Sequence, residues 1–197
     1  MSNYRFDETQ IASRLGQLDH RSRVAFALSC VERMLPNYRA FQREHHWGDV
    51  ETILRGIECG WAWVQGTKNA DINLVDIAVT CEEQAPDTED FQSRYVSPAL
   101  DAATATAALM ELIRTADVAK AVEVASLSRD TVDMFVQEIE SMPANSPDIE
   151  ERIRLHPLMQ AELERQNRDL DLLEAGANID DLAAKWRSPA VSNIGLS

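Results

Sequence analysis

The chain has 197 residues, of which 45% are hydrophobic and 26% charged, with only seven Gly, seven Pro and a formal net charge of −14 at pH 7. This composition is typical of one globular domain built from long helices, and it excludes a largely disordered chain. The negative charge argues against binding to nucleic acid or to an anionic membrane through the net field, because phosphate contacts need clustered Lys and Arg.

Three cysteines, Cys30, Cys59 and Cys81, lie far apart in apolar helical contexts. Their odd number and the lack of a C-x-x-C pair favour free buried thiols in a reducing compartment over disulfides or a zinc site. The first residues lack the apolar run of a signal peptide, and no stretch approaches the ~18 apolar residues of a membrane span. We therefore expect a cytoplasmic protein that binds no membrane.

Apolar residues recur at helical spacing from the N-terminus onward and predict a series of helices. A short amphipathic helix ends around Asp19. A longer helix starts at His20 and is broken or kinked at Pro36, which cannot donate the i to i−4 hydrogen bond, although the apolar face continues beyond it. Asp49 closes the next loop and is expected to cap the helix that follows.

Residues 71 to 84 are ambiguous, because Ile72, Leu74, Ile77 and Val79 partly alternate as they would in a strand. The same residues also fit one face of a helix, and Pro86 would end that helix. We expect a helix in this segment.

The central element is an alanine-rich helix at about residues 97–115. Ser97 is expected to be its N-cap and Pro98 its first helical residue, where a missing N–H costs no intrahelical bond. Small side chains on several faces let neighbouring helices approach closely. An amphipathic helix follows from Asp117 to Glu140. The expected fold is therefore all-α, a single-domain multi-helix bundle around this buried helix.

The last third of the chain starts with a loop at residues 142–148 that holds two prolines. A helix is expected from 149 to 175, with a break at His156-Pro157, and a short helix near residues 180–186. We expect residues 1–187 to form one all-α domain and residues 188–197 to form a C-terminal tail.

Five stretches are specific in their order and spacing: C-V-E-R-M-L-P-N-Y at 30–38 with Phe41, W-G-D at 47–49, S-P-A-L-D-A at 97–102, A-V-E-V at 121–124 and S-N-I-G at 192–195. Together they resemble the YjaG family, small bacterial proteins classed as a domain of unknown function. The resemblance spans nearly the whole chain and implies an all-α fold, with a helix at residues 71 to 84. It brings no reaction, substrate or catalytic residue with it.

His45, His46 and Asp49 come nearest to a metal-ligand cluster. Adjacent histidines on a helix point about 100° apart, and no H-E-x-x-H spacing is present, so a surface loop or cap is favoured over a metal site. Glu82-Glu83 begins the E-E-x-x-E pattern of all-α nucleotide pyrophosphohydrolases, but Pro86 stands at its last position.

Four carboxylates of the two central helices could converge between helices as in di-iron bundles: Glu111, Glu123, Asp130 and Asp133. The Glu-x-x-His partners that such sites need are missing, which favours a solvated face. The sequence therefore predicts no cofactor.

The best candidate for a binding site is the polar cluster Glu32, Arg33, Asn37 and Tyr38 beside Pro36. At 100° per residue, Glu32 lies about a quarter-turn from the apolar stripe of its helix, whereas Arg33 lies on the opposite face. Two interpretations stay open: a structural corner in which Glu32 pairs with a buried donor, and a site for a partner or ligand.

We expect a non-enzymatic interaction or regulatory protein that acts through its acidic surface, with a basic protein as partner or a second copy in a homodimer. The alternative is a carboxylate-based, metal-dependent enzyme or a small-molecule binder. Metal analysis of protein purified without a histidine tag separates the two, because stoichiometric metal favours the second.

Overall fold

The alanine-rich helix α5 (Val96–Thr115) lies at the centre of the structure, a computed structural model that describes residues 3–67, 73–143, 145–187 and 189–197. The helices packed against it are α2 (His20–His45), α3 (Val50–Val64), α4 (Leu74–Glu82) and α6 (Val118–Ile139). Ala99, Ala102, Ala103 and Ala105 are fully buried, so small side chains do let four neighbours approach one helix. The predicted all-α bundle around a buried alanine-rich helix is confirmed.

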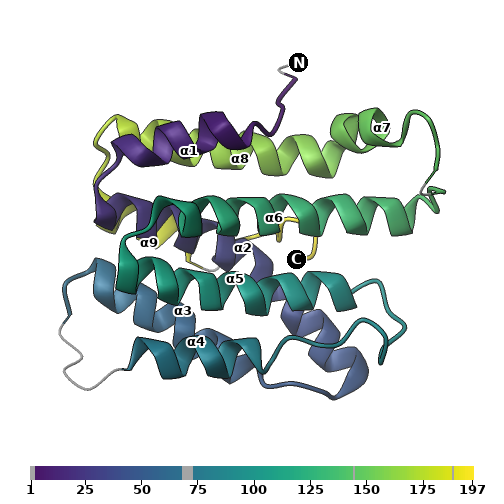
Figure 1. Ribbon diagram of the computed structural model, residues 1–197, viewed down its shortest axis with the longest axis horizontal. Helices are drawn as coiled ribbons and strands as arrows, with labels where there is room; N and C mark the ends of the chain where they lie inside the picture. The colour runs from purple at the N-terminus through teal and green to yellow at the C-terminus, as the bar shows by residue number, and fades with distance from the viewer. Residues whose placement is uncertain (1–2, 68–72, 144, 188) are drawn as a thin grey trace.

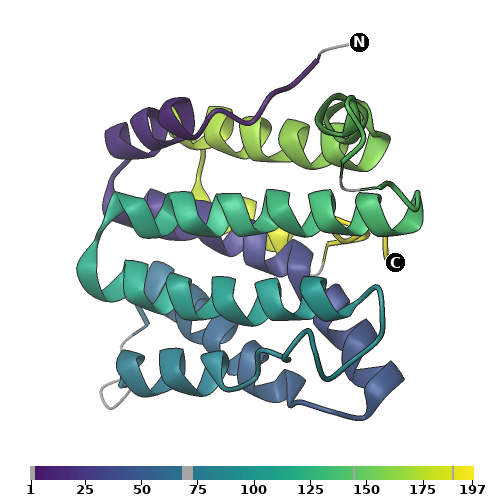
Figure 2. The same ribbon diagram turned by 45° about the vertical axis from the view of Figure 1, so that its right-hand side comes forward.

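The other helices cover the far side of α6 and α2: α1 (Glu8–Gln17), α7 (Ile149–Leu155), α8 (Pro157–Glu174) and α9 (Ile179–Trp186). In Figure 1, α1 and α8 form an outer layer, α6 lies beneath them, α5 follows and α4 forms the opposite side. Figure 2 shows the same order after a turn of the molecule. Every regular element within the described ranges is a helix.

Several helix starts lie where the sequence predicts them, because their caps are local. Asp49 accepts a hydrogen bond from the Glu51 N–H (3.0 Å), and Asp117 accepts one from the Ala119 N–H (2.9 Å). The break between α7 and α8 falls at His156, and Pro157 is the first residue of α8.

Two proline predictions were wrong in detail. Helix α2 continues through Pro36 to His45 without the expected break, because only one backbone donor is lost there and buried side chains on both sides keep the helix packed. The alternative, a kink at Pro36, stays a prediction. Helix α5 begins at Val96, one residue before Ser97, and Tyr95 occupies the N-cap position without a side-chain cap bond. Pro98 is tolerated in the first turn, where its N–H would have no intrahelical partner.

The ambiguous segment contains a helix, α4, which begins at Leu74; residues 71 and 72 of the predicted helix lie outside the described residues. The sequence predicts no stretch that approaches the length of a membrane span. Helix α5 is nevertheless long and apolar enough to cross a membrane, with a mean hydropathy of 1.2. Because 78% of that stretch is buried inside the structure, its composition is also that of a core helix.

The C-terminal residues fold back onto the bundle, and Figure 2 shows this yellow segment beside α2 and α6. The Asn193 N–H donates to the Arg33 carbonyl (3.1 Å), which belongs to the turn of α2 that precedes Pro36. The Asn193 side chain donates to the Ser128 carbonyl of α6 (2.9 Å), and Ile194 is buried in a small apolar cluster with Val132 and Leu163. This docking places the segment against the middle of α2.

Candidate functional site

The four polar residues of the predicted cluster lie on the middle of α2 but face different neighbours. Glu32 faces α3, where its Oε1 accepts a hydrogen bond from the Trp61 indole N–H (2.8 Å). Arg33 faces α8 instead. Tyr38 donates to the Gln84 carbonyl (3.0 Å), beyond α4. The structure therefore distributes the cluster over three environments.

Arg33 and Asn37 belong to one buried polar network. Arg33 donates to both carboxylate oxygens of Glu162 (3.1 and 3.2 Å) and to Asp169 (2.8 Å). Asn37 donates to the Asn193 side chain (2.7 Å). Three further side chains donate to the two carboxylates: Ser29, Ser128 and Gln166. These hydrogen bonds replace those that the two buried carboxylates would make to water, which lowers the cost of burying them.

The charge of Arg33 is fixed by this network. Burial by itself would lower the pKa of the guanidinium, but the carboxylates of Glu162 and Asp169 outweigh that effect and raise the pKa above its ordinary value. Arg33 thus stays cationic, and its hydrogen bonds join α2 to α8. Arg33 is therefore engaged inside the bundle, between α2 and α8.

The acidic members of the network were not identified from the sequence. Glu162, Gln166 and Asp169 recur at positions i, i+4 and i+7 on the inner face of α8, among the buried Met159 and Leu163. That polar stripe on α8 and the single arginine on a partly apolar face of α2 were the two features of the sequence that could have indicated a buried ion pair. Helical spacing alone does not show that the two faces meet.

A cleft lies on the other side of α2, between α2, α3 and the C-terminal segment, with a volume of about 600 Å³. We call it the α2–α3 cleft. Its floor is apolar and includes Leu35, Leu54 and Ile57, and the buried Glu32 also lines it. Pro189 and Leu196 line its opposite side. Of the predicted cluster, only Glu32 lines this cleft.

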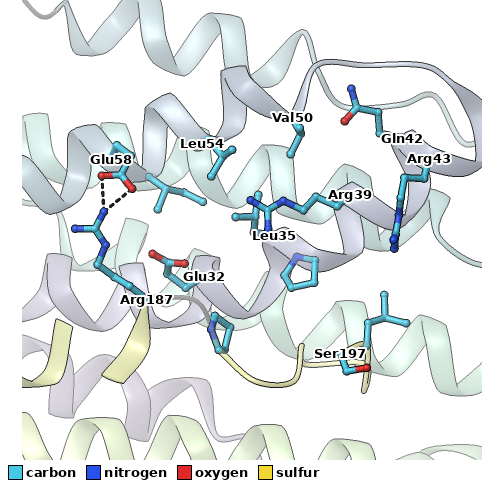
Figure 3. A pocket seen from close by; sticks show the side chains of 14 residues that line it. Glu32, Leu35, Arg39, Gln42, Arg43, Val50, Leu54, Glu58, Arg187 and Ser197 are labelled. Carbon is cyan, nitrogen blue, oxygen red and sulfur yellow. Dashed lines mark hydrogen bonds and ion pairs between the residues drawn. The ribbon is translucent and has the colours of Figure 1, made fainter. Parts of the chain in front are cut away.

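Arginines border both ends of the α2–α3 cleft. At one end Arg187 donates to both oxygens of Glu58, and its guanidinium lies 6.0 Å from the ring centre of Trp61. At the other end Arg43 and Arg39, one helical turn apart, extend from α2, and Figure 3 shows Arg39 reaching over Leu35. In the part of the chain that the structure describes, neither Arg39 nor Arg43 makes an ion pair or a side-chain hydrogen bond.

The weak metal candidates have separate surroundings. The His45 ring contacts Phe41 and Phe91, with ring centres 4.9 and 5.1 Å away. His46 ends α2 in a left-handed conformation, and Asp49 caps α3. Among the described residues, no three His, Cys, Asp or Glu side chains come close enough together to hold a metal ion.

The carboxylates of the central helices also have local partners. Glu111 pairs with Arg114 and Glu123 with Lys120, each three residues away on the same helix, while Asp130 pairs with its neighbour Arg129. Arg129 also lies 3.7 Å from Asp133. The residues considered for a di-iron arrangement are thus engaged along the helix surfaces.

The family comparisons agree with this architecture. The model of the family described as "Protein of unknown function (DUF416)" matches residues 10–197. The uncharacterized protein YjaG of Escherichia coli (strain K12) is 28% identical over 201 residues, covering 96% of this chain and 97% of that protein. YjaG of Salmonella typhimurium is 27% identical over 202 residues, with the same coverage of both chains.

A solved structure has the same fold. The crystal structure of a DUF416 family protein from Shewanella baltica OS155 matches with a TM-score of 0.83 and 26% sequence identity, covering 94% of this chain and 97% of that one. The resemblance to the YjaG family inferred from five short stretches is therefore confirmed over almost the whole length. This chain belongs to the DUF416 family.

Proposed function

We propose that this protein binds a small amphipathic anion in the α2–α3 cleft, that is, a molecule with an apolar body and one carboxylate, sulfonate or phosphate group. The observation that carries the proposal is the pair Arg39 and Arg43, which stand without an anionic partner in the described structure beside an apolar floor. The volume of about 600 Å³ falls within the roughly 300–1,000 Å³ of small-molecule sites.

The local charge supports an anion at this place. The charged side chains that line the cleft are three arginines and two glutamates. Glu58 is bound to Arg187, and Glu32 accepts a hydrogen bond from the Trp61 indole. The net charge of the whole chain is −14, but exposed charges beyond about 8 Å are largely screened at physiological ionic strength. Arg39 and Arg43 are therefore the cations of the cleft that a bound anion could pair with, and their guanidinium groups match the geometry of carboxylate and phosphate oxygens.

The apolar floor of the cleft favours a ligand that also has an apolar part. Leu35, Leu54 and Ile57 would contact a hydrocarbon or aromatic body, which gains from leaving water. The expected basic protein partner, the homodimer and the cytoplasmic location stay predictions.

The proposal is tested with a fluorescent amphipathic anion, 8-anilinonaphthalene-1-sulfonate, and with N-phenyl-1-naphthylamine, which has the same aromatic body without the sulfonate. The natural chain should bind one sulfonate per chain. The double variant Arg39→Gln/Arg43→Gln should weaken sulfonate binding by about tenfold or more, because charged hydrogen bonds contribute about 1.5–3 kcal/mol. Binding of the neutral amine should change little.

The matched control is Arg5→Gln/Arg152→Gln, which removes the same charge from two exposed arginines outside the cleft. This control should bind the sulfonate as the natural chain does. Equal weakening in both double variants would show that only the overall charge matters, and the proposal would then be wrong.

A further inference from the structure

A second, smaller cavity of about 260 Å³ lies between α8, α9 and residues 189–191, and we call it the α8–α9 cavity. Four cationic side chains line it: Arg33, Arg165, Arg168 and Lys185. They come from three different helices, and the only carboxylate in the lining is that of Asp169. The whole chain has 19 Lys and Arg against 33 Asp and Glu, so the positive charge of this cavity is opposite in sign to the net charge of the protein.

Two of the four cations are not needed for internal pairing. Arg33 is bound to Glu162 and Asp169, and Arg165 donates to the Ser192 carbonyl (3.1 Å). Arg168 and Lys185 are exposed and make no ion pair or side-chain hydrogen bond with any described residue. The network below them supplies donors to both oxygens of Glu162 and to Oδ2 of Asp169 without using Arg168 or Lys185, so these two cations can turn toward a ligand.

Arg165 lies beside two of the other cations and both buried carboxylates, and burial is the main influence on its pKa. It is partly buried, and burial lowers the pKa of its guanidinium. Among the charges, Glu162 and Asp169 raise that pKa, while the positive charges of Arg33 and Arg168 lower it. An anion held between these groups would offset both burial and mutual repulsion.

We propose that the α8–α9 cavity is a binding site for a phosphate-type oxyanion, either free or as the phosphate group of a small molecule. Arg165 and Arg168 supply planar guanidinium groups that can donate to two oxygens at once, and Lys185 supplies a third cation from α9. The small volume suits a single tetrahedral anion better than the amphipathic ligand proposed for the α2–α3 cleft. The two sites use different cations, although Pro189 borders both.

The test is calorimetric titration with inorganic phosphate at constant ionic strength set with chloride. The natural chain should bind phosphate saturably with a millimolar or lower dissociation constant. The variant Arg168→Gln/Lys185→Gln should weaken this binding by about tenfold or more, because it removes two cationic donors. Because both side chains are exposed and unpaired, the variant should keep the melting temperature of the natural chain.

The matched control is Arg39→Gln/Arg43→Gln, which removes the same charge from the other site and should leave phosphate binding unchanged. Conversely, Arg168→Gln/Lys185→Gln should leave binding of the naphthalene sulfonate unchanged, so that each proposal can fail alone. Trp186 lines the α8–α9 cavity, and its replacement by Phe should remove any fluorescence response to phosphate while the heat of binding persists. Absence of saturable phosphate binding, or equal weakening by both double variants, would overturn the proposal.

Discussion

Arg33 of α2 and Glu162 of α8 form an ion pair through two hydrogen bonds, from Nε to Oε2 at 3.1 Å and from Nη2 to Oε1 at 3.2 Å. Their exposed fractions are 5% and 0%, and 129 positions separate them in the sequence. Asp169 adds a second carboxylate to the same guanidinium. A buried charge network therefore joins two helices that would otherwise meet through apolar contacts.

Replacing Arg33 by Ala should lower the free energy of unfolding by about 3–5 kcal/mol, because two buried carboxylates lose their counter-charge. The control is Arg114→Ala, which breaks an exposed pair with Glu111 on the same helix. That variant should unfold at nearly the same urea concentration as the natural chain. If Arg33→Ala also left the urea midpoint unchanged, the network would not be a major source of stability.

Features that depend on residues close together in the sequence could be predicted, whereas features that depend on distant residues could not. Caps such as Asp49 and the break at His156 depend on neighbours within a few residues, and both were predicted. The break expected at Pro36 does not occur, because the local loss of a hydrogen bond is outweighed by packing on either side, which the local pattern does not show.

The candidate sites depend on long-range contacts and could be predicted only in part. Glu32 was identified, but its partner Trp61 lies on another helix, and Arg39 and Arg43 look like ordinary surface residues until the C-terminal segment is seen beside them. Likewise, Arg33 was identified while Glu162 and Asp169 were not. Nothing within one helical turn indicates such partners.

Asp101 should make stability depend on pH. Burial raises the pKa of this carboxyl to about 6, and the charge of Asp130 adds to that rise, while the hydrogen bond from Thr131 (2.8 Å) opposes it. The folded state therefore holds a proton that the unfolded state, with an ordinary Asp pKa near ~3.9, has released. The free energy of unfolding contributed by this group should fall as pH rises from about 4 to about 6 and stay low above that range.

The variant Asp101→Asn isolates this effect, because Asn can still accept from Thr131 but carries no charge. Urea unfolding of both chains at several pH values should show a gain of about 1–3 kcal/mol for the variant at pH 7 and little or no gain near pH 4. A gain that is the same at both pH values would mean that the titration of Asp101 is not its cause.

The close packing around α5 predicts a cost for larger side chains. Ala103 and Ala107 are buried, so replacing either by Leu should destabilise the chain by about 1–3 kcal/mol through overpacking. Ala119→Leu, at an exposed position near the start of α6, is the control. Thermal unfolding that is unchanged for both buried variants would show that α5 has room around it.

Two helical glycines should respond in opposite ways to Ala. A Cβ at Gly56 would lie 2.6 Å from Thr106 Cγ2, and Thr106 is buried and hydrogen-bonded to the Ala102 carbonyl, so Gly56→Ala should destabilise. A Cβ at Gly16 would meet nothing within 4 Å. Gly16→Ala should therefore raise the free energy of unfolding by about 0.5–1 kcal/mol, through higher helix propensity. Equal effects of the two substitutions in urea unfolding would contradict the close contact between α3 and α5.

The most direct measurement is a crystal structure of the natural chain bound to 8-anilinonaphthalene-1-sulfonate. The sulfonate should lie within hydrogen-bonding distance of Arg39 or Arg43, with the aromatic body over Leu35 and Leu54 in the α2–α3 cleft. Arg187 should remain on Glu58 at the other end. A molecule bound elsewhere on the surface, with the cleft holding only solvent, would contradict the proposed anion-binding role of this cleft.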